Sequence, residues 1–136
     1  MISTLKVFVT VIVSFIAIDY IWLNFVAKKF YINQMNEVGR ISNGEFQPII
    51  WSAIACYIFL AIGIIYFVLP SIQPQQSYLW VFLTGALFGM VCYGVYDSTN
   101  HATLKSWPVV LMAVDIAWGS FVTGLVTCIT WYVRSL

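Results

Sequence analysis

The chain of 136 residues is 62% hydrophobic and only 8% charged, with a mean hydropathy of +0.92. Soluble domains carry about 25% charged residues, so this composition excludes a water-soluble fold. The net charge of +1 comes from few ionisable groups, which excludes a basic surface for nucleic acid. We expect a single membrane domain, because four spans of about 20 residues would fill the whole length.

Hydrophobic runs predict an all-α integral membrane bundle of four transmembrane helices, at residues 5–27, 48–69, 78–100 and 108–133. Pro48 and Pro108 suit the first turn of a helix, and Pro70 ends the second run. The first run is too long for a signal peptide and shows no clear cleavage site, so we interpret it as a retained span. Four spans place both termini on one side of the membrane.

The segment 28–47 is the only long connection between the predicted spans. It ends near the turn-forming pair Asn43-Gly44. A short amphipathic helix at the membrane surface and a plain polar connector are both compatible with its apolar residues, Phe30, Tyr31, Met35 and Val38. We also expect Trp51 and Trp107 to lie at the interface on this side, which we call the loop side.

Positive residues favour one orientation of the bundle. Four lie on the loop side (Lys28, Lys29, Arg40 and Lys105) and two on the side of the termini (Lys6 and Arg134). Because positive residues concentrate in cytoplasmic loops, this count predicts cytoplasmic first and third loops and outward termini.

Small residues recur at a spacing of four in the last two spans: Gly85 with Gly89, and Ser120 with Gly124. This spacing lets helix backbones approach closely. The stripes can serve the internal bundle or a homo-oligomer. We expect the bundle first, because a single chain of four helices must pack itself.

Three of the five acidic residues, Asp19, Asp97 and Asp115, fall within the predicted spans. A charged aspartate at the bilayer centre costs about 2.5–3.5 kcal/mol on insertion scales, so such residues usually face the bundle interior and usually have a function. At 1.5 Å per residue, Asp19 and Asp115 lie roughly 10–12 Å from the loop-side ends of their helices. Asp97 lies near the same end, so the three carboxyl groups converge.

The helical period adds neighbours to these acids. A D-x-x-W pattern joins Asp19 to Trp22 and repeats as Asp115 and Trp118. One face of the third span carries Met90, Tyr93, Asp97, Asn100 and His101. The predicted ligand-binding residues are Asp19, Trp22, Tyr93, Tyr96, Asp97, Asn100, Asp115 and Trp118.

No lysine or arginine lies at this depth in the spans to neutralise the acids. Some acids then stay protonated, or water, a cation or a polar head group enters from the loop side. Under a purely structural alternative, the acids cross-link helices through hydrogen bonds to tyrosine, asparagine and tryptophan.

Metal and cofactor signals are weak. Asp97 and His101 have the i, i+4 spacing of two metal ligands, but no second histidine or cysteine pair supports them. Cys56, Cys92 and Cys128 fall in three different apolar runs and match no zinc or redox motif. The sequence identifies no cofactor.

These residues leave four functions open. The leading hypothesis is a pocket that binds a lipid head group or an amphipathic small molecule through Asp19, Asp97, Asp115 and Asn100. The second is a lipid-modifying enzyme that uses Asp19, Asp97 or Asp115 as general acid or base. The third is a proton or cation pathway in an oligomer. The fourth is an accessory subunit bound to a partner membrane protein.

The segment Tyr96–Pro108 and the run Asp115-Ile-Ala-Trp118-Gly119, together with Asp19 and Trp22-Leu23, resemble a family of small bacterial membrane proteins. That family is classed only as domain of unknown function 2177, and the likeness spans essentially the whole chain. The resemblance implies a four-helix protein of the inner (cytoplasmic) membrane with the same polar cluster, and no established activity. It also implies an apolar residue at the position of His101, which weakens the metal interpretation.

Overall fold

The computed structural model describes residues 2–136, in which four helices are long and apolar enough to cross a membrane: Thr4–Val26, Ile50–Ser71, Tyr78–Thr103 and Val109–Ser135. Each begins and ends within three residues of the range expected from the sequence. Many large apolar side chains point outward, among them Trp51, Phe59 and Phe67. An apolar exterior on helices of this length fits an all-α membrane bundle.

The first span is built from α1 (Ile2–Ile21) and a π-helical segment, Trp22–Val26. The second is built from α3 (Ile50–Gly63), a π-helical segment, Ile64–Val68, and one 3₁₀ turn, Leu69–Ser71. The third and fourth are α4 (Tyr78–Thr103) and α5 (Val109–Ser135). Pro48 and Pro108 lie just before their helices instead of in the first turn, because Ile49 and Pro108 are the extended residues that cap them.

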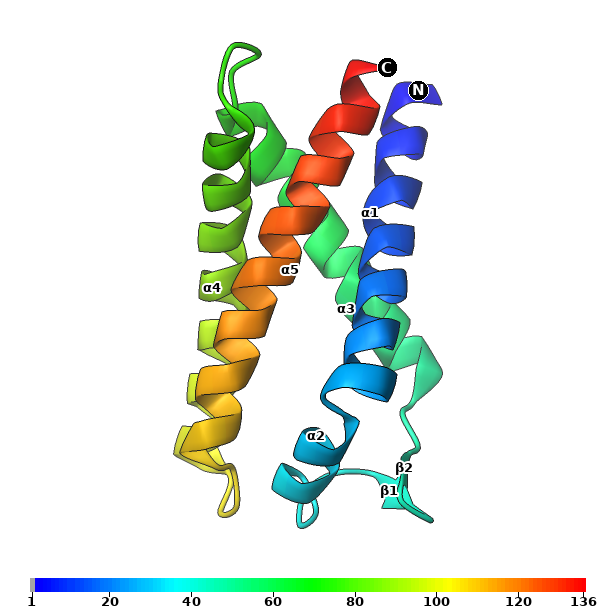
Figure 1. The fold of residues 1–136 in the computed structure, drawn as a ribbon, viewed down its shortest axis with the longest axis vertical. Helices are drawn as coiled ribbons and strands as arrows, with labels where there is room; N and C mark the ends of the chain where they lie inside the picture. Colours follow the sequence, from blue (N-terminus) through cyan, green and yellow to red (C-terminus); the bar gives the residue numbers. More distant parts are fainter. Residues whose placement is uncertain (1) are drawn as a thin grey trace.

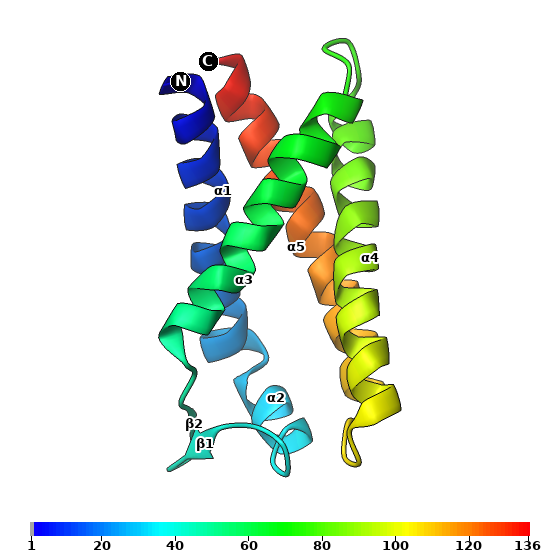
Figure 2. The same cartoon turned by 180° about the vertical axis from the view of Figure 1, so that it is seen from behind.

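Figures 1 and 2 show both chain termini at one end of the bundle and the short elements at the other end, the loop side. Helices α4 and α5 run side by side in both views, whereas α3 crosses the bundle obliquely. The glycines of α4 allow the close pairing: a Cβ at Gly85 would overlap Thr127, and a Cβ at Gly89 would overlap the carbonyl of Gly119. The small-residue stripe therefore packs the bundle itself.

The connection 28–47 contains both a helix and a hairpin. Helix α2 (Lys28–Gln34) buries Tyr31, whereas Val38 lies beyond the helix and is exposed. Two short antiparallel strands, β1 (Ile41–Ser42) and β2 (Glu45–Phe46), flank the turn. Asn43 and Gly44 both adopt positive φ, at 53° and 73°, which is the conformation that a tight two-residue hairpin needs. The amphipathic helix thus exists, but it is shorter than its apolar residues suggested.

Buried side chains form two clusters. The larger one centres on the half of the bundle near the termini and includes Val11, Phe15, Ile64, Val122 and Val126. The smaller one lies on the loop side and consists of Ala27, Tyr31, Trp107 and Leu111. Trp107, which was expected at the membrane interface on this side, is only 7% exposed, because it packs against other side chains of the bundle. Its indole N–H donates to a buried acceptor, the Asp97 carboxyl group.

Candidate functional site

Asp19, Asp97 and Asp115 come from three different helices, α1, α4 and α5. Asp97 is fully buried, Asp19 is 6% exposed and Asp115 is half-buried. Within residues 2–136 the one ion pair joins Lys28 to Glu45 in the first connection, so no cation of the described chain pairs with these carboxyl groups. Neutral donors must therefore satisfy them.

Asp19 binds donors from two other helices. The indole N–H of Trp118 on α5 donates to its Oδ1 at 2.9 Å. The hydroxyl of Tyr57 on α3 donates to its Oδ2 at 3.0 Å. One carboxyl group thereby connects α1, α3 and α5, and both of its oxygens have a partner.

Asp115 is covered from the loop side by α2. The hydroxyl of Tyr31 donates to Asp115 Oδ1 at 2.7 Å and accepts a longer bond, 3.4 Å, from the indole of Trp22. Trp22 in turn stacks on Trp118, with ring centroids 4.1 Å apart and planes 4° from parallel. The two D-x-x-W patterns are therefore joined through their tryptophan rings.

Tyr31 lies outside the spans, and its surroundings favour the neutral phenol. Burial is the main cause that raises the pKa of Tyr31 above its ordinary value, and the Asp115 carboxylate raises it further. Tyr31 therefore remains a hydrogen-bond donor to Asp115 at neutral pH.

Asp97 is the least satisfied of the three acids. Its Oδ1 accepts the indole N–H of Trp107 at 3.1 Å, whereas its buried Oδ2 meets no donor. Asp97 on α4 and Asp115 on α5 lie near each other, so two like charges would repel if both were ionised.

Two other expected residues of α4 are aromatic. The ring of Tyr93 packs against Gly119, where a Cβ would overlap it. Tyr96 meets Trp107 edge-to-face, with ring centroids 5.8 Å apart, and is itself exposed. Tyr93 and Tyr96 also line an opening of about 290 Å³ between α3 and α4, with Cys56, Leu60 and Cys92.

His101 and Asp97 both contact Trp107, at different groups. His101 Nδ1 lies 2.8 Å from the backbone carbonyl oxygen of Trp107, and Asp97 accepts from the indole. Across residues 2–136, no group of three or more histidine, cysteine, aspartate and glutamate side chains is arranged to hold a metal ion.

Three members of the hydrogen-bonded network were missing from the expected set: Tyr31, Tyr57 and Trp107. Tyr31 was placed in the connection and Trp107 at the interface, and Tyr57 lies in a span without charged residues. The need of the three acids for hydrogen-bond donors was the signal that could have found them. The chain offers tyrosine or tryptophan in each of its α-helices.

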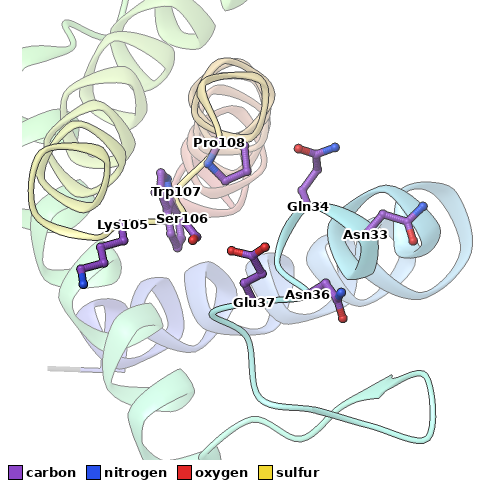
Figure 3. Close-up of a pocket in the computed structure, with 8 residues that line it drawn as sticks. All are labelled: Asn33, Gln34, Asn36, Glu37, Lys105, Ser106, Trp107 and Pro108. Atoms are coloured by element: carbon purple, nitrogen blue, oxygen red, sulfur yellow. The ribbon is translucent and has the colours of Figure 1, made fainter.

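A groove of about 430 Å³ lies on the loop side of the network (Figure 3). We call it the loop groove. It runs between the end of α2 and the α4–α5 connection, and it is lined by Asn33, Gln34, Asn36, Glu37, Lys105, Ser106, Trp107 and Pro108. Trp107 separates this groove from Asp97, since it lines the groove and binds the acid.

Comparison with known proteins gives one match. The model of a family described as "Predicted membrane protein (DUF2177)" matches residues 4–132. No curated protein and no solved structure matches the sequence. The matched range contains every residue of the network described above.

Proposed function

The chain belongs to the DUF2177 family of predicted membrane proteins, and from this premise we propose that it binds a lipid head group or another amphipathic molecule at the loop-side end of its bundle. The polar anchors are Asp19, Asp97, Asp115 and Asn100, with Trp22, Tyr93, Tyr96 and Trp118 as aromatic lining. We place the protein in the inner membrane of a bacterium, with the first and third loops in the cytoplasm.

The closeness of Asp97 to Asp115, together with the unpartnered oxygen of Asp97, carries this proposal. The two carboxyl groups lie near each other between two spans, no described cation pairs with them, and the buried Oδ2 of Asp97 has no donor. Such an arrangement costs more than packing requires. A ligand that donates hydrogen bonds, such as an ammonium or hydroxyl group, would supply what the pair lacks.

A ligand that approaches Asp115 from the loop side must pass α2. This helix has seven residues and follows the π-helical segment Trp22–Val26, and Tyr31 holds it against Asp115. A ligand hydroxyl or ammonium that replaces the Tyr31 hydroxyl on Asp115 would displace α2 without unfolding the four spans.

Native mass spectrometry of the gently extracted protein tests this function. Wild type is compared with Asp97→Asn and Asp115→Asn, which keep an oxygen to accept from Trp107 and Tyr31 but remove the acid. We expect a bound mass above the bare chain in wild type and its loss in both variants. Glu45→Gln, which removes a carboxylate that pairs with Lys28 and makes no hydrogen bond to the network, is the control and should retain the mass. A bare chain in every sample would refute the proposal.

The same carboxyl pair favours lipid modification as a second candidate. When two carboxyl groups share a proton, one can act as acid while the other acts as base. The lipids of cells that express wild type are compared with those of cells that express Asp115→Asn. A new or missing lipid species in the wild type supports catalysis, and identical lipid profiles argue against it.

A further inference from the structure

The loop groove carries two opposite charges that do not pair. Glu37 and Lys105 both line it, and the single ion pair within residues 2–136 joins Lys28 to Glu45 instead. In Figure 3 the Glu37 carboxylate points toward the α4–α5 connection, while the Lys105 side chain points away from Glu37 on the far side of Trp107. Glu37 thus belongs to one wall of the groove and Lys105 to the other, and the long, exposed Lys105 side chain must turn toward the groove to contact a ligand there.

Neutral polar side chains complete the lining of the groove. The groove is also lined by Asn33, Gln34, Asn36 and Ser106, whose amides and hydroxyl both donate and accept hydrogen bonds. The chemistry of the wall is therefore mixed, with one anion, one cation and several neutral partners.

The position of the groove matches the level of lipid head groups. One wall follows the first span by way of α2, and the other wall ends at Pro108, immediately before α5 enters the membrane. The polar head-group region forms the outer part of a bilayer roughly 40–45 Å thick. Side chains just beyond the ends of two spans lie in this region.

We propose that the loop groove binds a zwitterionic phosphoamine head group, with its phosphate at Lys105 and its primary ammonium at Glu37. A purely anionic head group would leave Glu37 facing a negative charge, and a purely cationic ligand would face Lys105. A primary ammonium donates three hydrogen bonds to carboxylate and amide oxygens, whereas a quaternary ammonium donates none. The groove therefore selects ethanolamine-type over choline-type and glycerol-type phospholipids.

This site rests on its own residues and not on the buried acids. The two are adjacent, because Trp107 lines the groove and donates to Asp97. A ligand in the groove would therefore contact Trp107, the residue that lies between the groove and Asp97.

Lipid titration followed by native mass spectrometry tests the groove. The purified full chain is titrated separately with phosphatidylethanolamine, phosphatidylcholine and phosphatidylglycerol. We expect the tightest binding for phosphatidylethanolamine, and a loss of about two- to fivefold in Glu37→Gln and in Lys105→Gln, as for exposed charge pairs. Lys29→Gln, which removes an exposed charge of α2 outside the groove, should leave binding unchanged.

Equal binding of the three lipids, or unchanged binding in both groove variants, would overturn the proposal. Tighter binding of phosphatidylglycerol would also overturn it, since a simple cation site would then suffice. The last titration uses soluble glycerophosphoethanolamine. If it binds as well as the lipid, the phosphoamine chemistry stands and the ligand comes from the water phase.

The two proposals fail separately. Asp97→Asn should leave the preference for phosphatidylethanolamine intact, because the groove contains no part of that carboxyl group. If this preference persists while no tightly held mass depends on Asp97 and Asp115, only the buried site is refuted. If the preference for phosphatidylethanolamine is absent while a tightly held mass still depends on Asp97 and Asp115, only the groove proposal is refuted.

Discussion

At the scale of single residues, each of the three carboxyl groups accepts a hydrogen bond from an aromatic side chain outside its own helix. Tyrosine and tryptophan suit this role in a membrane because each combines a large apolar ring with one polar donor. The ring contacts the apolar bundle while the donor satisfies the acid. The network thus holds three carboxyl groups in an apolar environment without a paired cation.

The hydrogen bond from Tyr57 to Asp19 gives a direct test of this network. Tyr57→Phe removes only the hydroxyl, so we expect unfolding to become easier by about 0.6–1.7 kcal/mol, as for other hydrogen bonds between membrane helices. Reversible unfolding in mixed micelles measures the change. Tyr66→Phe, at a side chain 66% exposed, is the matched control and should have no effect. Equal losses in both variants would show that the bond to Asp19 does not stabilise the fold.

Tyr31 predicts how the stability depends on alkaline pH. The ordinary tyrosine pKa is about 10, and burial beside Asp115 raises that of Tyr31 in the folded protein. Above pH of about 10 the unfolded chain therefore loses a proton that the folded chain keeps, so stability must fall as pH rises.

We expect this alkaline loss of stability to be smaller in Tyr31→Phe. Unfolding of both proteins is followed between neutral and strongly alkaline pH, and the difference between them isolates Tyr31 from the other seven tyrosines. Parallel pH profiles would contradict the inferred environment of its hydroxyl.

At the scale of elements, α4 and α5 form the closest pair in the bundle, and α2 is the least anchored part. The pair is close because glycines on α4 face threonines and a backbone carbonyl on α5. Helix α2 is held by the bond from Tyr31 to Asp115, by the ion pair of Lys28 with Glu45 and by a small apolar cluster that includes Trp107 and Leu111. We therefore expect motion on the loop side to involve α2 before any of the spans.

Two glycines of α4 test the close pairing. A methyl group at Gly89 would overlap Gly119 and Thr123, so Gly89→Ala should destabilise the bundle by about 1–3 kcal/mol. At Gly94 nothing lies within 4 Å of an added Cβ. Gly94→Ala should then be neutral or stabilising, by up to about 1 kcal/mol, because alanine favours helix. Unfolding in mixed micelles measures both, and a larger loss at Gly94 would contradict the packing.

At the scale of the whole molecule, the ionisable groups are distributed unevenly along the membrane normal. The first connection, the third connection and the loop-side ends of the spans contain all five acidic residues and four of the six basic ones. Only Lys6 and Arg134 lie toward the end that carries the termini. The bundle therefore has one polar end, where both proposed sites lie, and one end that is almost uncharged.

This charge distribution predicts the orientation in the membrane. Because lysine and arginine concentrate in cytoplasmic loops, a reporter fused after Leu136 should lie outside the cytoplasm. A reporter that is active only outside, paired with one that fluoresces only in the cytoplasm, gives the answer from two fusions. If the fluorescent fusion is bright and the reporter that works only outside is inactive, the orientation is the opposite of the predicted one. It would also place the loop groove on the opposite leaflet.

The membrane class and the four spans could be predicted from the order of the residues alone. Each of these depends on contiguous residues, since hydropathy and helical rise add up along the chain. The Asn43-Gly44 pair also contained a local signal for the hairpin, since only a few residue types tolerate positive φ.

The pairing of each acid with its donor depends instead on how the helices pack in three dimensions. Tyr31 is 84 residues from Asp115, Trp118 is 99 from Asp19, and Tyr57 is 38 from Asp19. No periodicity within one helix relates such positions; their contacts depend on how the helices cross and on where α2 folds back. The inward turn of Trp107 has the same cause, because its acceptor, Asp97, lies on a different helix from the one that Trp107 precedes.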